Sequence, residues 1–264
     1  MSDAPGRVVD LTRRAVDEGA ELVVVVGGDG TVNEAVNGLL HGGAACELAV
    51  VPCGTGDDFA RTFGIPTKTE EALAVAANGR ARQVDVGRAR FGSGESGSER
   101  YFANFAGAGI SGAIALKGAA TSRRFGARAA YFWATVAVFT RWNSIPMTVE
   151  ADGESREGRM FEVIVANGAY AAGGMHIAPD ASPDDGLFDV VLIGDVTKFD
   201  FLTTFPKIYR GTHVGHPRID VLRARSVTVT AETPLPVVLD GEQPGSTPVS
   251  FDVLPGALKL REPA

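Results

Sequence analysis

Residues 23–31 constrain the possible fold more than any other stretch of the chain. They read Val23-Val24-Val25-Val26-Gly27-Gly28-Asp29-Gly30-Thr31, and a helix-like run, residues 32–40, follows them. Four β-branched residues bounded by glycine predict a buried strand. Thr31 and Glu34 have the spacing of a capping box that opens a helix. The sequence therefore predicts a strand, a glycine turn and a helix in direct succession.

This glycine turn has the features of an anion site. Glycines let a ligand approach the backbone closely, and the unpaired N–H groups at a helix start attract phosphate oxygens. Asp29 would repel a polyphosphate unless Mg²⁺ bridges the two groups or the carboxylate handles a proton of the second substrate. A tight turn with a solvated Asp29 is the structural alternative. The turn is not a Walker A loop, because no Lys-Ser/Thr follows its last glycine.

A second unit of the same kind follows. Gly42-Gly43 would stop the first helix, and residues 48–51 predict another buried strand. The turn around Gly54-Thr55-Gly56 leads into a short helix that Gly64 would end. Helices are also expected at residues 8–18 and 69–78. This alternation predicts a parallel α/β sheet, in which ligands bind at the carboxyl ends of the strands. An ordinary connection with an Asp–Arg pair to Arg61 is the alternative.

The predicted secondary structure changes from alternating helices and strands to mainly strands near residue 84. Residues 83–91 alternate between polar and apolar, and from Ile145 onward many short strands are expected, with turns such as Asp152-Gly153. Helical residues between 110 and 142 interrupt this pattern. We therefore expect an α/β domain in residues 1–83 and a mainly β domain in residues 84–253.

Composition limits the possible partners and compartment. The formal net charge of −7 argues against a nucleic-acid partner, which normally requires a basic face. Two cysteines are too few for a disulfide framework, so a reducing cytoplasm is the expected location. The first residues lack the features of a signal peptide, and the longest apolar run, residues 129–140, is too short to span a bilayer. Peripheral membrane contact remains open.

Four motifs, in order and spacing, resemble the soluble diacylglycerol and sphingosine kinase family. They are Gly27-Gly28-Asp29-Gly30-Thr31, Pro52-x-Gly54-Thr55-Gly56-x-Asp58-Phe59-Ala60-Arg61, Asp184-Asp185-Gly186-Leu187-Phe188-Asp189 and Leu239-Asp240-Gly241-Glu242. The first motif is shared with NAD kinases and phosphofructokinases, whereas the second is much more specific to lipid kinases. The resemblance covers nearly the whole chain.

This resemblance implies a fold and a set of site residues. The fold would be an NAD-kinase-like α/β nucleotide domain followed by a β-sandwich, with the active site in the cleft between them and residues 254–264 returning to the first domain. The residues expected to hold ATP are Gly27, Gly28, Asp29, Gly30, Thr31, Asn33, Gly54 and Thr55. Some members bind a structural Mg²⁺, which would place Asp185 and the carbonyls of Ser182 and Leu187 as its ligands.

Phosphoryl transfer requires positioning, charge neutralisation and a group oriented on the attacking hydroxyl. The resemblance gives Glu242 the role of general base on the lipid hydroxyl, while Asp29 and Asp240 can serve Mg²⁺ or orientation. The structural alternative is a hairpin turn at Asp240-Gly241 with a solvated Glu242. We expect an ATP- and Mg²⁺-dependent lipid kinase. An NAD kinase-like enzyme and a non-catalytic lipid-binding remnant are the alternatives.

The chain departs from the family pattern in two places. Family members usually carry about fifty further residues ahead of the first helix, so two sheet strands are expected to be absent, leaving an exposed hydrophobic edge. Asp57 stands where the family usually has Asn, which adds negative charge near phosphate.

A basic stretch of the sequence suggests how the protein contacts a membrane that contains its lipid substrate. Residues 100–149 contain no Asp or Glu. Arginines at 123, 124 and 128 lie among aromatic residues. This mixture favours docking on anionic head groups at a membrane, with a core helix as the alternative. The expected partner is a lipid at the membrane surface, and a homodimer is left open.

Overall fold

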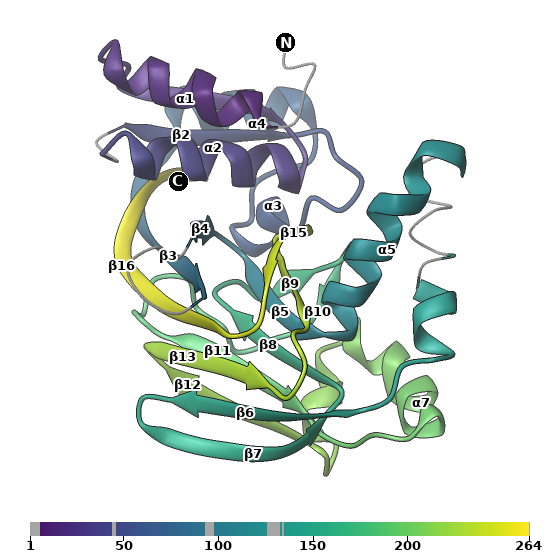
Figure 1. Ribbon diagram of the computed structural model, residues 1–264. Helices are drawn as coiled ribbons and strands as arrows, with labels where there is room; N and C mark the ends of the chain where they lie inside the picture. The colour runs from purple at the N-terminus through teal and green to yellow at the C-terminus, as the bar shows by residue number, and fades with distance from the viewer. Residues whose placement is uncertain (1–5, 44–45, 93–97, 126–132, 134, 264) are drawn as a thin grey trace.

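A computed structural model describes residues 6–43, 46–92, 98–125, 133 and 135–263 (Figure 1). Helices and two parallel strands form the amino-terminal part, whereas antiparallel strands dominate the rest of the chain. The predicted fold class, α/β plus β, is confirmed.

The amino-terminal part alternates helices with parallel strands. Its elements are α1 (Arg7–Asp17), β1 (Leu22–Gly27), α2 (Asp29–His41), β2 (Glu47–Pro52), α3 (Asp58–Thr62) and α4 (Thr69–Asn78). β1 and β2 pair in parallel, with Val23 opposite Leu48. Glycines end the helices as predicted, because Gly42 is the C-cap of α2 and Gly64, at φ +63°, follows α3. Glycine suits this left-handed position since it has no Cβ to clash.

β1 is the outermost strand of its sheet and is only half buried. Val25 packs into the core, whereas Val24 and Val26 on the opposite face are 43% and 61% exposed. The prediction of a buried strand is wrong for Val24 and Val26, because no element of the described chain covers this face. The hydrophobic edge expected from the sequence is therefore present.

α2 begins three residues earlier than the sequence pattern predicts. Its N-cap is Gly28, so Thr31 already lies inside the first turn. The Glu34 carboxylate accepts hydrogen bonds from the backbone N–H groups of Gly6 and Val8, at 2.9 and 3.0 Å. The predicted capping box is therefore wrong. Glu34 instead caps α1, whose own N-cap is a glycine without a side chain.

Two long antiparallel strands connect the amino-terminal part to the β-rich part. β3 (Arg80–Phe91) and β16 (Val249–Glu262) pair with each other, and β16 also lies parallel to β2. The sheet has the order β1-β2-β16-β13-β6-β7, with β4 paired to β3. Its other strands are β4 (Ser98–Phe102), β6 (Ile145–Ala151), β7 (Glu154–Met160) and β13 (Ser226–Ala231). The domain boundaries at 84 and 254 stay a prediction, since β3 and β16 run across them.

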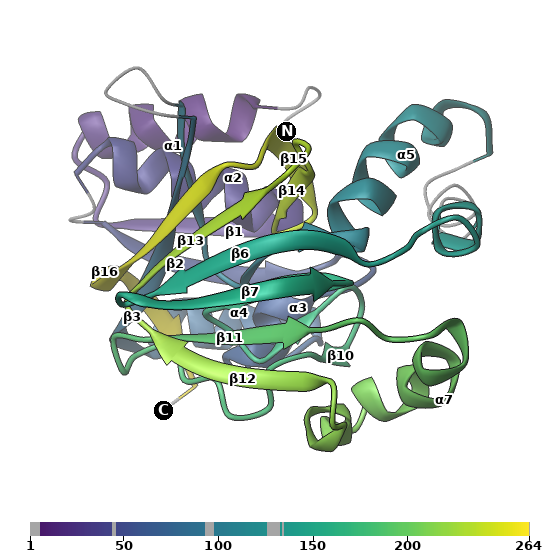
Figure 2. The ribbon, with the colours of Figure 1, turned by 60° about the horizontal axis from the view of Figure 1, so that its bottom comes forward.

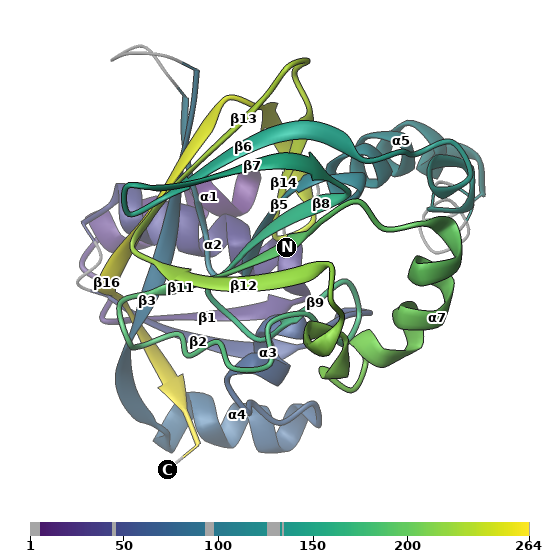
Figure 3. The same ribbon diagram turned by 90° about the horizontal axis from the view of Figure 1, so that it is seen from below.

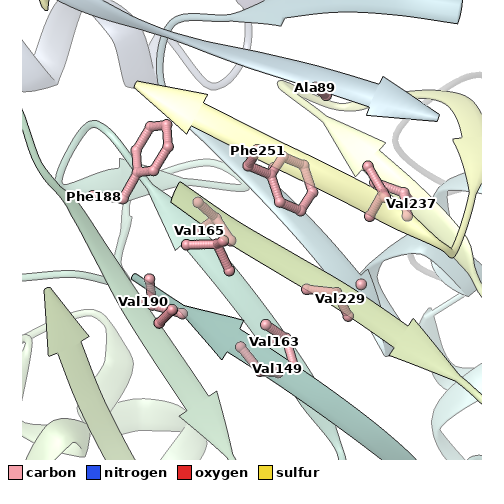
Figure 4. Packing of buried hydrophobic residues seen from close by; sticks show 14 of the residues in the cluster. Ala89, Val149, Val163, Val165, Phe188, Val190, Val229, Val237 and Phe251 are labelled. Carbon is pink, nitrogen blue, oxygen red and sulfur yellow. The ribbon is translucent and has the colours of Figure 1, made fainter. Parts of the chain in front are cut away.

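A second sheet packs against the first and completes a β-sandwich (Figure 2). Its strands, in spatial order, are β12 (Ile219–Ala224), β11 (Phe188–Ile193), β8 (Glu162–Ala166), β5 (Phe105–Gly109), β14 (Pro236–Leu239) and β15 (Glu242–Ser246). In the core, the Phe102 ring lies 5.6 Å from that of Phe188 and 5.9 Å from that of Phe251. Valines from both sheets lie around the rings of Phe188 and Phe251 (Figure 4). Full burial of each such side chain contributes about 1.5–3 kcal/mol.

Helices stand out on one flank of the sandwich (Figures 1 and 3). They are α5 (Ile110–Phe125), residues 135–139, α7 (Lys198–Ile208) and the short helix η1 (Thr212–Gly215). The Phe201 ring of α7 lies 4.6 Å from Phe139 and 5.2 Å from Phe161. The sequence pattern did not predict α7, whose start carries a capping box of Thr197 and Asp200. No helix in the described part of the chain is long and apolar enough to cross a membrane.

Candidate active site

Two glycine turns lie side by side at the carboxyl ends of β1 and β2. A Cβ atom on Gly54 would lie only 2.6 Å from the Cα atom of Gly28, so glycine is required for the two turns to touch. Thr55 is exposed, and a Cβ atom on Gly30 would meet nothing within 4 Å. The first turn of α2 is therefore open beside both glycine turns. Free N–H groups at a helix start in this arrangement can bind phosphate.

Asp29 ties the first glycine turn to the helix after the second. Its Oδ1 accepts a hydrogen bond of 2.9 Å from the backbone N–H of Phe59 in α3. Burial raises the pKa of Asp29, and the negative charges of Asp58 and Asp57 raise it further. Like charges gathered in this way favour a cation nearby, because a cation would relieve their repulsion. The position of Asp29 is thus compatible with the predicted contact to Mg²⁺.

Asp57 and Asp58 hold the second glycine turn in place. The Asp57 carboxylate accepts a hydrogen bond of 2.9 Å from the N–H of Gly54. Asp58 is buried and accepts two hydrogen bonds of 2.7 Å from Gly173-Gly174, in the turn between β9 (Tyr170–Ala171) and β10 (Met175–His176). Asp58 also forms an ion pair of 2.8 Å with Arg61. The Asp–Arg pair expected as the structural alternative for this turn is therefore present.

Asp240 joins α2 to the turn between β14 and β15. Its carboxylate is buried, and each oxygen accepts two N–H donors. The donors are Asn33 Nδ2 at 2.9 Å and Ala103 N at 2.7 Å to Oδ2, and Asn104 N at 3.1 Å and Phe105 N at 2.8 Å to Oδ1. A carboxylate has about four lone-pair sites, so all of them are used. A direct role for Asp240 on Mg²⁺ or on the substrate hydroxyl does not fit this geometry.

Burial raises the pKa of Asp240, and the backbone and Asn33 donors act in the opposite direction. No acceptor faces the carboxylate among its four bonded partners, so a proton on either oxygen would displace one of them. We therefore regard Asp240 as ionised at neutral pH. Its charge is then a fixed part of the surroundings of Glu242.

Glu242 directly follows the Asp240-Gly241 turn. Both turn residues have positive φ, 45° and 94°, as a two-residue hairpin requires, so the hairpin expected as the structural alternative is present. The Glu242 side chain remains exposed. Partial burial raises the pKa of Glu242, the charges of Glu34 and Asp240 raise it further, and Arg100 opposes them. An accessible carboxylate with a raised pKa is suited to accept a proton.

Asn33 lies on the side of α2 that faces the sandwich. It is buried, and its Nδ2 donates to the Tyr101 carbonyl at 3.1 Å as well as to Asp240. Asn37, one turn later, donates to the carbonyls of Asn33 and Tyr101, both at 2.9 Å. This geometry does not support the predicted contact of Asn33 with nucleotide. The spacing of two asparagines four residues apart on one helix face was a sequence signal for this network.

In the loop before β11, the side chains around the predicted Mg²⁺ site bond to protein groups. Asp185 Oδ1 accepts a hydrogen bond of 3.0 Å from the N–H of Leu187, and Oδ2 forms an ion pair with Arg223. The hydroxyl of Ser182 donates to the neighbouring Asp184 at 2.8 Å. Within the described residues, no cluster of three or more His, Cys, Asp or Glu could hold a metal. The metal role of this loop stays a prediction, and the Arg223 guanidinium is the positive group that pairs with Asp185 in the described structure.

Two family models match the chain. The model of the diacylglycerol kinase catalytic domain matches residues 1–89. The model of the YegS C-terminal NAD kinase beta sandwich-like domain matches residues 105–262, which is more than half of the chain.

Individual relatives agree with these models. The chain is 31% identical to a diacylglycerol kinase of Mycobacterium tuberculosis (strain ATCC 25618 / H37Rv) over 256 residues, which cover 96% of this chain and 80% of that protein. It is 28% identical to a diacylglycerol kinase of Staphylococcus carnosus (strain TM300) over 240 residues, which cover 91% and 76% of the two proteins.

Solved structures show the same relationship. A crystal structure of a candidate diacylglycerol kinase from Bacillus anthracis str. Sterne matches with a TM-score of 0.78 and 26% identity, over 99% of this chain and 84% of that chain. Yeast NADH kinase, crystallised with NADH, is 12% identical with a TM-score of 0.52, over 91% of this chain and 60% of that chain. That likeness concerns the fold alone.

Proposed function

This chain belongs to the diacylglycerol kinase family, and on that premise we propose that it is a lipid kinase. It transfers the γ-phosphate of ATP, supplied as the Mg²⁺ complex, to a hydroxyl of diacylglycerol or a related lipid. One observation carries this proposal. The Asn33–Asp240 hydrogen bond of 2.9 Å holds the hairpin of Glu242 against the helix that follows the first glycine turn. A proton acceptor and a phosphate-binding helix start therefore belong to one site.

The glycine turns bind the phosphates in this proposal. The open first turn of α2, with Gly30 and Thr31, and the exposed Thr55 of the second turn supply N–H and hydroxyl donors. Asp29 would hold the Mg²⁺ that accompanies ATP, and the positive charge of the ion would offset the repulsion of Asp29 by Asp57 and Asp58. Catalysis by positioning and charge neutralisation is typical of phosphoryl transfer.

Glu242 accepts the proton of the lipid hydroxyl as the hydroxyl oxygen attacks the γ-phosphorus and ADP leaves. The raised pKa of this carboxylate brings it closer to the working pH, where a general base is most effective. Asp240 acts as a positioning residue, because it touches neither phosphate nor hydroxyl in this arrangement. Its four hydrogen bonds fix the turn from which Glu242 projects.

Transfer of labelled γ-phosphate from ATP to diacylglycerol tests this assignment. We expect Glu242→Gln to lower kcat by about 10²-fold or more, the usual contribution of a general base. Glu157→Gln, on an exposed strand position of β7, is the matched control and should keep full activity. Transfer to NAD instead of lipid, or ATP binding without transfer, would contradict the proposal.

The pH dependence gives a second readout of the same residue. Because the pKa of Glu242 is raised, the active ionised form is lost as pH falls through a value above that of an ordinary glutamate. The rate should therefore rise with pH through this value in the wild type. The same rise in Glu242→Gln would assign it to another group.

We propose a cytoplasmic location with peripheral membrane contact. The net charge of −7 and the two unpaired cysteines support a reducing compartment without a nucleic-acid partner. Diacylglycerol resides in bilayers, so a kinase acting on it meets its substrate at a membrane surface. A homodimer, which the sequence leaves open, stays untested.

A further inference from the structure

Exposed hydrophobic side chains gather on the helical flank of the sandwich. Eleven large hydrophobic side chains are exposed among the residues whose burial is described, and six of them lie on this flank. The six are Leu116, Trp133, Val136, Phe199, Leu202 and Tyr209. α5 and α7 stand on the same side of the molecule in both Figure 2 and Figure 3. Clustering of this kind marks an interaction surface more often than scattered exposed residues do.

α7 is apolar on two opposite sides. Its inner side packs Phe201 against Phe139 and Phe161, so the orientation of the helix is fixed. Its outer side exposes Phe199 by 74% and Leu202 by 61%, and Tyr209, just past the end of the helix, by 51%. Positions 199, 202, 206 and 209 recur every three or four residues and therefore form one stripe. A helix needs only its inner side to fold, so this outer stripe requires another explanation.

Basic side chains accompany the stripe. α7 and the two residues after it, 198–210, contain Lys198, Lys207 and Arg210 against one acid, in a chain whose net charge is −7. Lys207 and Arg210 are exposed, and each directly follows a stripe position in the sequence. The single acid, Asp200, is engaged in the capping box at the start of α7. An apolar stripe with a cationic rim is the pattern of a helix that lies in a membrane interface.

We propose that the outer side of α7 (Phe199, Leu202 and Tyr209, with Lys207 and Arg210) docks on a bilayer that contains anionic lipids. The inference rests on the proposed function, since a lipid kinase requires access to a bilayer. The apolar stripe enters the interface, and the cations contact lipid head groups. A second copy of the chain fits this surface less well, because a symmetric contact would bring the cations of two copies together.

This surface differs from the basic stretch predicted from the sequence. The arginines at positions 123, 124 and 128 belong to residues whose side chains lie outside those that the structure describes. Trp142 of that stretch is turned inward, where its Nε1 donates to the Phe161 carbonyl at 3.1 Å. The docking residues on α7 lie more than fifty positions later in the chain.

Co-sedimentation with vesicles tests the proposal on the full chain. The probes are phosphatidylcholine vesicles with and without phosphatidylglycerol. We expect Phe199→Gln/Leu202→Gln to weaken binding by about tenfold or more, because both exposed side chains lose their burial in the interface. Leu73→Gln, at a 49% exposed site on α4, is the matched control and should bind as the wild type does. Unchanged binding of the double variant would overturn the proposal.

The charges are tested separately. We expect the double variant Lys207→Gln/Arg210→Gln to bind anionic vesicles about fivefold more weakly for each charge removed. Added salt should reduce the difference in affinity between this variant and the wild type. Binding to pure phosphatidylcholine should change little. Equal losses on both kinds of vesicle would contradict a role for anionic lipid.

A substrate that needs no bilayer separates docking from catalysis. With a short-chain diacylglycerol below its aggregation limit, the Phe199→Gln/Leu202→Gln variant should keep the wild-type rate, and with vesicle-borne diacylglycerol it should be slow. Docking without any phosphate transfer would leave this proposal standing while refuting the proposed kinase activity. If the wild type is a dimer and the double variant a monomer in sedimentation velocity, the stripe is a subunit interface and the proposal fails.

Discussion

At the scale of single residues, Glu162 stands out because it is a fully buried carboxylate without an ion pair in the described structure. It lies at the start of β8, where its oxygens accept hydrogen bonds from the hydroxyl and the N–H of Ser111 in α5, the latter at 2.8 Å. Burial raises the pKa of Glu162 to about 7, although the bonds from Ser111 and Ile110 oppose the shift. The Glu162 carboxyl group therefore binds a proton more tightly in the folded protein than in the unfolded chain.

The sign of the resulting pH dependence follows directly. Below the unfolded pKa of about 4.3, Glu162 is protonated in both states and its contribution to stability is fully present, and this contribution is lost as pH rises through about 7. Glu162→Gln imitates the protonated form, so we expect it to match the wild type at about pH 4 and to be more stable by about 3–4 kcal/mol at about pH 8. Thermal unfolding at both pH values measures this difference. Glu157→Gln is the exposed control, and parallel pH profiles of wild type and Glu162→Gln would refute the assignment.

At the scale of elements, the sequence predicts what local contacts decide. The strand–glycine–helix units and the stops at Gly42 and Gly64 depend on neighbouring residues, and they are confirmed. α7 was missed although Thr197 and Asp200 carry a local signal, because apolar residues on both of its sides obscure a helical period.

The candidate site divides in the same way. The glycine turns are local and were predicted from the sequence. The hydrogen bond that joins Asn33 to Asp240 spans 207 positions of the sequence. The other three donors to Asp240 are backbone N–H groups, which every residue type except proline supplies. No sequence pattern specifies such partners, since they depend on how the strands are packed. The same reason explains why Glu34 was expected to cap α2 but caps α1.

The loop before β11 yields a prediction about metal removal. Arg223 pairs with Asp185 and lies 3.9 Å from the buried carboxylate of Asp189, whose pKa is raised by burial and lowered by Arg223. Because the guanidinium supplies the positive charge, a chelator should leave the melting temperature of the nucleotide-free protein unchanged. Arg223→Gln should lower the free energy of unfolding by about 1 kcal/mol at neutral pH, a modest value for a half-exposed side chain.

Calorimetry with and without chelator measures both effects. Arg225→Gln, two residues later, is the control because no ion pair of Arg225 occurs in the described structure. A chelator-dependent fall in the melting temperature of the wild type would instead support the predicted Mg²⁺ at Asp185.

At the scale of the whole molecule, the two halves of the site come from distant parts of the chain that a few elements hold in register. β16 pairs with the first residues of β2 and with β13 inside the sandwich, so one strand belongs to both regions. The buried carboxylates of Asp58 and Asp240 add two cross-connections, one to the β9–β10 turn and one to α2. A change at either carboxylate should therefore affect stability and catalysis together.

Asp240→Asn tests this coupling most directly. The amide keeps the shape of the carboxylate, but its NH₂ group would face two N–H donors, so two hydrogen bonds to a charged acceptor are lost. We expect the free energy of unfolding to fall by about 2–4 kcal/mol. Because the charge of Asp240 helps to raise the pKa of Glu242, the pH midpoint of the transfer rate should also move to lower pH.

These readouts separate positioning from a structural role alone. A misplaced Glu242 should reduce kcat while the KM for ATP changes little, because the glycine turns do not contact Asp240 in the described structure. Asp220→Asn, at an exposed position of β12, is the matched control and should leave the stability and the pH midpoint unchanged. If Asp240→Asn lowered stability but left both kcat and the pH midpoint as in the wild type, Asp240 would hold the hairpin without setting the base, and the coupling inferred between the two regions would be absent.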